Sequence, residues 1–240
     1  RVFMPYSSLK NPSSETIKQL VILYNNKELN SLLKRGKELL SQYPEAFFIW
    51  NILGAALMDL GSTEEAAEAF KKVIYLNPKY ADGFSNLGVI LKKQGKLEDA
   101  AKAFEKAIAL KPNYAEAYNN VGNVFRDQGE LNKAIKAYNK VISLKPDYAV
   151  AHENYSFALL NSGRVKEGLD EYEWRLKTSQ FLSKHRHFSQ PFWDGNQSLN
   201  GKRILIWCEQ GIGDTINWSS CLSLITSQAE HCILECQDNS

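Results

Sequence analysis

Apolar residues recur along most of the chain at the three- and four-residue spacings that place side chains on one face of an α-helix. From residue 115 onward the first such stripe holds Tyr118, Val121, Gly122 and Phe125. A second stripe follows Gly129 and consists of Leu131, Ala134, Ile135, Tyr138, Val141 and Ile142. Pro146 then prevents the helix from continuing. The pattern predicts two helices joined by a glycine turn.

This helix pair recurs along the chain with a 34-residue period. Prolines recur at that interval, at Pro44, Pro78, Pro112 and Pro146. The glycine that ends the first helix also recurs, at Gly61, Gly95, Gly129 and Gly163. Glycine adopts the left-handed conformation that closes a helix at little cost. We therefore expect four copies, at residues 47–80, 81–114, 115–148 and 149–182.

Small and aromatic residues alternate at fixed positions of each copy. The eighth position is held by Gly54, Gly88, Gly122 and Ser156, and the fourth by Trp50, Phe84, Tyr118 and His152. The twentieth position is held by Ala66, Ala100, Ala134 and Gly168, and the twenty-fourth by Phe70, Phe104, Tyr138 and Tyr172. A glycine inside a helix costs about 1 kcal/mol in propensity, so its recurrence requires a compensating contact. We expect each glycine to face the alanine, with the aromatic ring beside them.

These positions resemble those of the tetratricopeptide repeat, which implies a mainly α-helical, right-handed solenoid of about five helix pairs. A degenerate copy at 13–46, which has Leu20 and Gly36 at the glycine and aromatic positions, is expected to cap the array after an N-terminal extension at 1–12. The copy at 149–182 has Gln180 in place of the proline and Arg175 at an apolar position, so the array is expected to stop there. Five copies exceed the roughly three that a stable array needs.

The sixth position of the first helix carries Asn86, Asn120 and Asn154, which stacking would place in a row on the concave side. An amide side chain offers a donor and an acceptor, and so matches a peptide backbone of any sequence. This row resembles the asparagine ladder of protein O-linked N-acetylglucosamine transferases, which implies a polypeptide or protein partner. Ile52 interrupts the row in the copy at 47–80, with Asn51 beside it.

An alternative role for the asparagines is to satisfy backbone groups between neighbouring repeats, or to be retained only through repeat duplication. Five further side chains are expected to face the same groove, and each of them can also be an ordinary solvated residue. They are Asn119, Asn123, Arg126, Lys92 and Glu116.

The 34-residue pattern ends near Leu182, and residues 183–202 are expected to form a linker. Residues 203–240 are expected to begin an α/β domain, with a strand from Arg203 to Cys208, a glycine turn, a helix from about Ile216 to Gln228 and a strand from His231 to Cys236. This is a partial, Rossmann-like βαβ segment. A dinucleotide fingerprint would need a third glycine near Ile216, and none is present.

Three segments of this tail resemble bacterial proteins that fuse tetratricopeptide repeats to a heptosyltransferase-like glycosyltransferase domain of the GT-B type. They are Tyr172-Glu173-Trp174-Arg175, Pro191-Phe192-Trp193-Asp194-Gly195 and Glu209-Gln210-Gly211-Ile212-Gly213-Asp214-Thr215, with Leu199 and Gly201-Lys202 between the last two. The resemblance implies that Asp214 is a catalytic base, although an aspartate there can equally cap the following helix. It also implies a nucleotide-sugar donor for a full-length parent, bound in a second domain, and no cofactor for the chain itself.

The chain starts at Arg1 and stops at Ser240 in mid-pattern, so we expect it to be a piece of a longer protein that does not transfer sugar alone. A segment of about 40 residues buries too little apolar area to fold independently. Residues 203–240 are therefore expected either to dock on the last repeat or to pair with another copy of the chain. Contacts for docking would be Trp174, Phe188, Phe192 and Trp193.

The composition narrows the remaining classes. Lysine plus arginine (29) nearly balances aspartate plus glutamate (27), which gives no field to attract nucleic acid. No apolar run reaches membrane-spanning length and no signal peptide is visible, so a cytoplasmic protein is expected. The four cysteines lack zinc-ligand spacing and His185 and His187 are expected to be solvated, so no metal site is expected. Two classes remain, a glycosyltransferase with a protein-binding arm and a non-catalytic scaffold.

Overall fold

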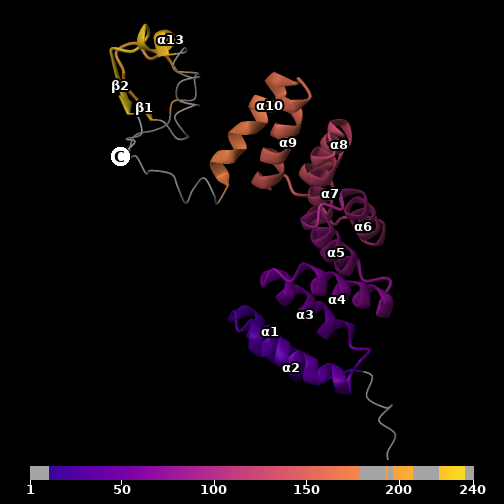
Figure 1. Ribbon diagram of the computed structural model, residues 1–240. Helices are drawn as coiled ribbons and strands as arrows, with labels where there is room; N and C mark the ends of the chain where they lie inside the picture. The colour runs from indigo at the N-terminus through magenta and orange to yellow at the C-terminus, as the bar shows by residue number, and fades with distance from the viewer. Residues whose placement is uncertain (1–10, 179–192, 194–196, 208–221, 236–240) are drawn as a thin grey trace, which may run out of the picture. The chain divides into compact units, whose positions relative to one another are not determined.

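Residues 14–172 form a row of five helix pairs in the computed structural model (Figure 1). The structure describes residues 11–178, 193, 197–207 and 222–235. The pairs are α1 (Ser14–Asn25) with α2 (Leu29–Gln42), α3 (Phe47–Asp59) with α4 (Thr63–Leu76), α5 (Ala81–Lys93) with α6 (Leu97–Leu110), α7 (Ala115–Asp127) with α8 (Leu131–Leu144), and α9 (Ala149–Asn161) with α10 (Val165–Tyr172). A short 3₁₀ helix, η1 (Glu173–Lys177), follows α10. The predicted helical solenoid is confirmed.

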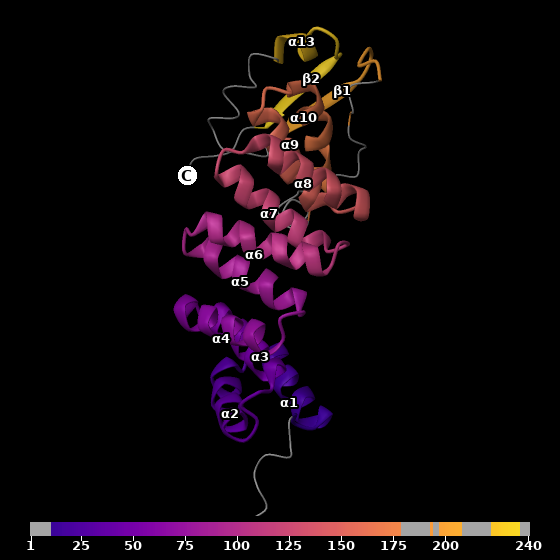
Figure 2. The same ribbon diagram turned by 90° about the vertical axis from the view of Figure 1, so that its right-hand side faces the viewer.

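The first helices of successive repeats lie next to one another along one side of the row. Each helix pair packs on the next through its second helix, and α3, α5, α7 and α9 also contact one another in sequence. No two second helices are in comparable contact within residues 11–178. Both ribbon views show the pairs stacked in chain order (Figure 2). The first helices therefore form the inner, concave face of the array, and we call this surface the inner face.

Every turn between the two helices of a repeat uses a left-handed residue. Four of these are the predicted glycines, for example Gly95 with a φ of 74° and Gly129 with a φ of 78°. The first repeat places Lys27 at the same position with a φ of 60°. This conformation is unfavourable for a residue with a Cβ, and the ammonium of Lys27 pairs with the carboxylate of Asp59 at 3.0 Å.

The recurring glycine of the first helix packs directly against the aromatic ring of the second. A Cβ added to Gly88 would lie 2.8 Å from Cε1 of Phe104, and one added to Gly54 would lie 2.8 Å from Cε1 of Phe70. The aromatic ring expected beside each glycine is therefore the nearest neighbour of the added Cβ. Phe70 and Phe104 are fully buried, so the glycine makes room for the largest side chain of the repeat core.

The first repeat exchanges these sizes between its two helices. Leu20 stands where the next three repeats have glycine and is buried, whereas Gly36 stands at the aromatic position. Leu53 from the second repeat fills the space beside Gly36, since a Cβ there would lie 2.5 Å from a Leu53 methyl carbon. The Leu53 side chain on α3 therefore fills the space that an aromatic ring on α2 fills in the other repeats.

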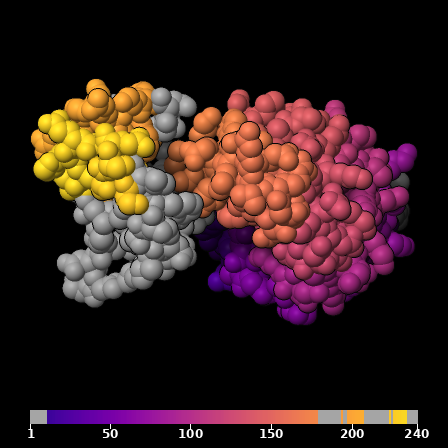
Figure 3. All heavy atoms as spheres, turned by 90° about the horizontal axis from the view of Figure 1, so that it is seen from above, coloured from indigo at the N-terminus to yellow at the C-terminus, as the bar shows by residue number. Residues whose placement is uncertain are grey.

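The last repeat is closed by an aromatic stack. The indole of Trp174 lies parallel to the imidazole of His152, with ring centroids 3.9 Å apart and an interplanar angle of 6°. Nε2 of His152 lies 2.8 Å from the carbonyl oxygen of Pro146, and Nδ1 contacts the carboxylate of Glu171. The stack and its polar contacts fix η1 against α9. The space-filling view shows this end of the array packed continuously on the preceding helices (Figure 3).

The second unit, residues 179–240, contains two parallel strands. Strand β1 (Arg203–Trp207) pairs with β2 (His231–Glu235), and Arg203 is in register with His231. The helix between them, α13 (Leu222–Thr226), ends at Thr226 and not near Gln228 as expected. Its predicted beginning and the glycine turn lie outside the described residues, as do Phe188 and Phe192. Cys232 is a free thiol.

Candidate functional site

The row of asparagines predicted from the sequence lies on the inner face, but its members differ in their hydrogen bonds. Nδ2 of Asn86 on α5 donates to Oδ1 of Asn51 on α3, at 3.2 Å. The donor is the sixth residue of its repeat and the acceptor is the fifth residue of the preceding repeat. Asn51 therefore continues the polar row into the second repeat, where Ile52 occupies the expected position.

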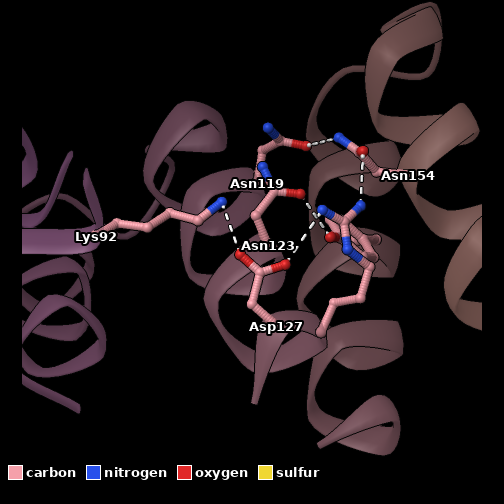
Figure 4. Close-up of polar contacts among 7 residues, drawn as sticks. Lys92, Asn119, Asn123, Asp127 and Asn154 are labelled. Carbon is pink, nitrogen blue, oxygen red and sulfur yellow. Dashed lines mark hydrogen bonds and ion pairs between the residues drawn. The ribbon is translucent and has the colours of Figure 1, made fainter. Parts of the chain in front are cut away.

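The same contact recurs two repeats later (Figure 4). Nδ2 of Asn154 on α9 donates to Oδ1 of Asn119 on α7, at 3.2 Å. Oδ1 of Asn154 in turn accepts from Nη1 of Arg126, at 3.2 Å. Asn119 is only 7% exposed. It therefore links two repeats from a buried position, whereas the sequence suggested a residue exposed in the groove. Among the described residues, these amides bond to one another between repeats, and not to the backbone groups that the sequence left open as an alternative.

An ion-pair chain joins three first helices on the same face. Asp127 lies between two cations, with Oδ2 3.0 Å from the Lys92 ammonium and Oδ1 3.4 Å from Nη2 of Arg126. Figure 4 shows Lys92 reaching Asp127 from α5. Each of these side chains is about one-third exposed or less. Because both cations share one carboxylate, the chain crosses from α5 through α7 to Asn154 on α9.

Asn123 is held by the aromatic residue of its own repeat. The phenol of Tyr138 donates to Oδ1 of Asn123 at 2.7 Å. Burial raises the pKa of Tyr138 well above that of a free phenol. The hydrogen bond from this hydroxyl fixes the orientation of the Asn123 amide.

Glu116 is not brought together with the other candidates. It lies in the first turn of α7 and pairs with Lys145, which follows α8. This contact holds the pKa of Glu116 below its usual range. Glu116 lies near the beginning of α7 and Arg126 near its end, so almost the whole length of the helix separates the two side chains.

Apolar side chains border the polar row in the last repeat. Val150 and Phe157 are 40% and 39% exposed and share one face of α9 with Asn154, at spacings of four and three residues. The edge of the Phe157 ring meets Tyr172, with centroids 5.8 Å apart. The inner face therefore offers amides, internally paired charges and an apolar strip.

The other predicted features are placed as follows. Asp214 lies outside the described residues, as do His185 and His187. Within the described part of the chain, no group of three or more histidine, cysteine, aspartate or glutamate side chains is arranged to hold a metal ion. No helix among the described residues has the length and apolarity needed to cross a bilayer.

Comparison with known proteins agrees with the helical geometry. Two family models, described as "Tetratricopeptide repeat" and "TPR repeat", match residues 86–149 and 54–95. Residues 54–149 therefore match tetratricopeptide repeats. A curated relative, the peroxisomal targeting signal receptor of Candida albicans (strain SC5314 / ATCC MYA-2876), is 34% identical over 67 residues. That match covers 28% of this chain and 11% of the receptor, so the chain corresponds to a small part of the receptor's length.

Several solved protein structures share the fold. MamA is 28% identical, with a TM-score of 0.61 over 68% of this chain and 95% of that one. YrrB, described as a TPR protein with an unusual peptide-binding site, is 20% identical, with a TM-score of 0.59 over 70% of this chain and 87% of that one. A thermophilic TPR protein of Thermus thermophilus, TTC0263, is 24% identical, with a TM-score of 0.56 over 69% and 91% of the two chains.

Proposed function

We propose that this array is a protein-interaction module whose inner face binds an extended polypeptide segment. The observation that carries the proposal is the row of amide side chains, which recurs in phase with the 34-residue repeat on the side where the first helices meet. Amides pair with backbone N–H and C=O groups irrespective of the bound side chains. The concave side of a helical solenoid also provides the long, continuous surface that an extended chain needs.

The charges of the inner face support a polypeptide over a nucleic acid. The cations Lys92 and Arg126 both contact the carboxylate of Asp127. Binding to a phosphate backbone depends on cations that are free to replace counterions. Paired cations supply little of that attraction.

The test uses the full 240-residue chain and a library of random 12-residue peptides displayed on phage. Peptides selected on the chain are synthesised, and their affinities are measured by calorimetry for two variants of the last repeat. Val150→Arg places a charge on the inner face, whereas Val165→Arg places it on an exposed position of α10. The matched pair separates the two surfaces, because each valine is at least 40% exposed.

We expect Val150→Arg to weaken peptide binding at least tenfold and Val165→Arg to leave the affinity within a factor of about two, since a cation on the inner face must be desolvated beneath the peptide. Equal affinities in both variants would place binding elsewhere and refute the proposal. A selection that yields no binding peptide would refute it as well.

We further propose that, in a longer protein containing this sequence, the array is the acceptor-recruiting arm of a glycosyltransferase that uses a nucleotide-sugar donor. The supporting observation is the parallel pairing of β1 and β2 around an intervening helix, which is how such α/β domains begin. Asp214→Asn in that longer protein is expected to lower nucleotide-sugar turnover by two or more orders of magnitude. Unchanged turnover would remove the catalytic role, and a longer protein without turnover would be a scaffold.

A further inference from the structure

The three asparagines of the row are not equivalent. Asn86 donates to Asn51, and Asn154 both donates to Asn119 and accepts from Arg126. Asn120 lies between them in the row and is partly exposed, yet its side chain forms no hydrogen bond with any residue that the structure describes. Neither polar atom of its side chain is a buried atom without a partner, so the amide is unpaired within the described part of the chain and open to solvent.

The sequence explains why Asn120 differs. Each bonded asparagine of the row reaches the residue 35 positions earlier, which is Asn51 for Asn86 and Asn119 for Asn154. For Asn120 that residue is Ser85, which is buried. The serine oxygen is one bond from Cβ, whereas the amide oxygen of asparagine is two bonds away, so serine does not span the same gap between repeats.

We infer that Asn120 alone of the three binds the backbone of the partner, while Asn86 and Asn154 couple neighbouring repeats. This inference rests on the proposed binding of a polypeptide to the inner face. An amide already bonded inside the protein gains little by exchanging one hydrogen bond for another. An amide whose groups are hydrated in the free protein can pair with both the N–H and the C=O of one peptide unit.

The surroundings of Asn120 indicate the chemistry of the segment that it meets. Lys92 and Arg126 share the single carboxylate of Asp127, so this cluster keeps a net positive charge. The apolar strip of Val150 and Phe157 borders the row on α9. The matching partner is an extended segment that places an apolar side chain on this strip and no cation beside Lys92 and Arg126.

The experiment uses the full chain and the peptide selected in the library screen described above. Asn120→Ala is compared with Asn86→Ala, Asn154→Ala and a control on the outer helix of the same repeat, Asn132→Ala, whose side chain is exposed on α8. Calorimetry gives the affinity, and thermal unfolding of the free variants gives their stability.

We expect Asn120→Ala to weaken binding about tenfold without lowering the unfolding midpoint. Asn86→Ala and Asn154→Ala should lower the midpoint, because each leaves a bonded partner unsatisfied, and should change the affinity less than threefold when binding is measured far below the midpoint. Asn132→Ala should change neither quantity. Should Asn120→Ala lower the midpoint too, Asn120→Asp, which keeps the size and loses the donor, takes its place.

A series of peptides with one N-methylated backbone amide at a time locates the contact. One methylation should weaken binding to the wild type strongly and binding to Asn120→Ala little, because the hydrogen bond that it blocks is already lost in the variant. Binding that depends equally on all three asparagines, or on Asn86 and Asn154 but not Asn120, would overturn the inference and leave the proposed function standing. If the three asparagine variants and Val150→Arg all bind the peptide as tightly as the wild type, the proposed function is overturned instead.

Discussion

Gly122 lies against the ring of Tyr138, so closely that a Cβ on the glycine would come within 2.7 Å of Cε1 of the tyrosine. The contact occurs in the middle of α7, where alanine would otherwise be favoured over glycine by about 1 kcal/mol. Packing therefore outweighs helix propensity at this position.

Gly122→Ala should destabilise the array by about 1–3 kcal/mol, the usual cost of adding a methyl group to a packed core. Urea unfolding of the full chain, followed by circular dichroism, measures this change. The matched background is Tyr138→Ala, in which the ring is absent and the same glycine substitution should be neutral or stabilising. An equal loss in both backgrounds would show that the ring is not the cause.

Replacing Lys27 with glycine should destabilise the folded chain less than replacing it with alanine. Both substitutions remove the ammonium that pairs with Asp59, but only glycine accepts the positive φ of 60° without strain. We expect the free energy of unfolding of Lys27→Gly to exceed that of Lys27→Ala by about 1 kcal/mol. Hydrogen exchange of α1 and α2 reports on this repeat, and stronger protection in the alanine variant would contradict the expectation.

Ser156 occupies the glycine position of the last repeat, with a fully buried hydroxyl that has no hydrogen-bond partner among the described residues. Ser156→Ala should raise the free energy of unfolding by about 1 kcal/mol, because it removes an unsatisfied polar group and favours the helix. Ser143→Ala is the control, since the exposed Ser143 hydroxyl donates to the carbonyl of Lys140 at 2.8 Å. A loss of stability in Ser156→Ala would mean that the hydroxyl is satisfied in solution.

Alkaline pH should weaken the array through Tyr114. Burial, reinforced by a hydrogen bond to Asp82, raises the pKa of Tyr114 to about 12 in the folded chain. Below pH ~10, the pKa of a free tyrosine, both the folded and the unfolded state keep the proton. Above it the unfolded state ionises first, so the free energy of unfolding falls as pH rises from about 10 to 12.

Tyr114→Phe removes that contribution and should lose less stability than the wild type between pH 9 and pH 11. Chemical unfolding at the two pH values measures the difference. Equal losses in both proteins would show that Tyr114 does not keep its proton in the folded state beyond the range of a free tyrosine.

The regular parts of the fold could be predicted because each rests on local physical chemistry that recurs in every repeat. Gly95 and Gly129 close helices through their φ angles, and Gly88 and Phe104 reveal a packing contact through their fixed spacing. Lys27 was missed as a left-handed residue because nothing in its own chemistry favours that conformation. The available signal was its position, one full repeat before Gly61.

The contacts between repeats were harder to predict. Asn86 meets Asn51 and Asn154 meets Asn119, and in each case the stacking offset between repeats shifts the pairing by one residue relative to the sequence period. That offset depends on how whole helices pack and is not visible in the apolar pattern. Asp127 was overlooked for a similar reason, since its role appears only when Lys92 and Arg126 converge on it from two sides.

The junctions between repeats are chemically alike, with Tyr80-Ala81, Tyr114-Ala115 and Tyr148-Ala149 at the same position. Removing residues 81–114 as a block would therefore create a Tyr80-Ala115 junction of the same composition as the native ones. The array can be shortened or lengthened by one whole unit while every remaining turn keeps its sequence. Duplication or deletion of one 34-residue repeat would therefore change the length of the array, and of its inner face, by one fixed step.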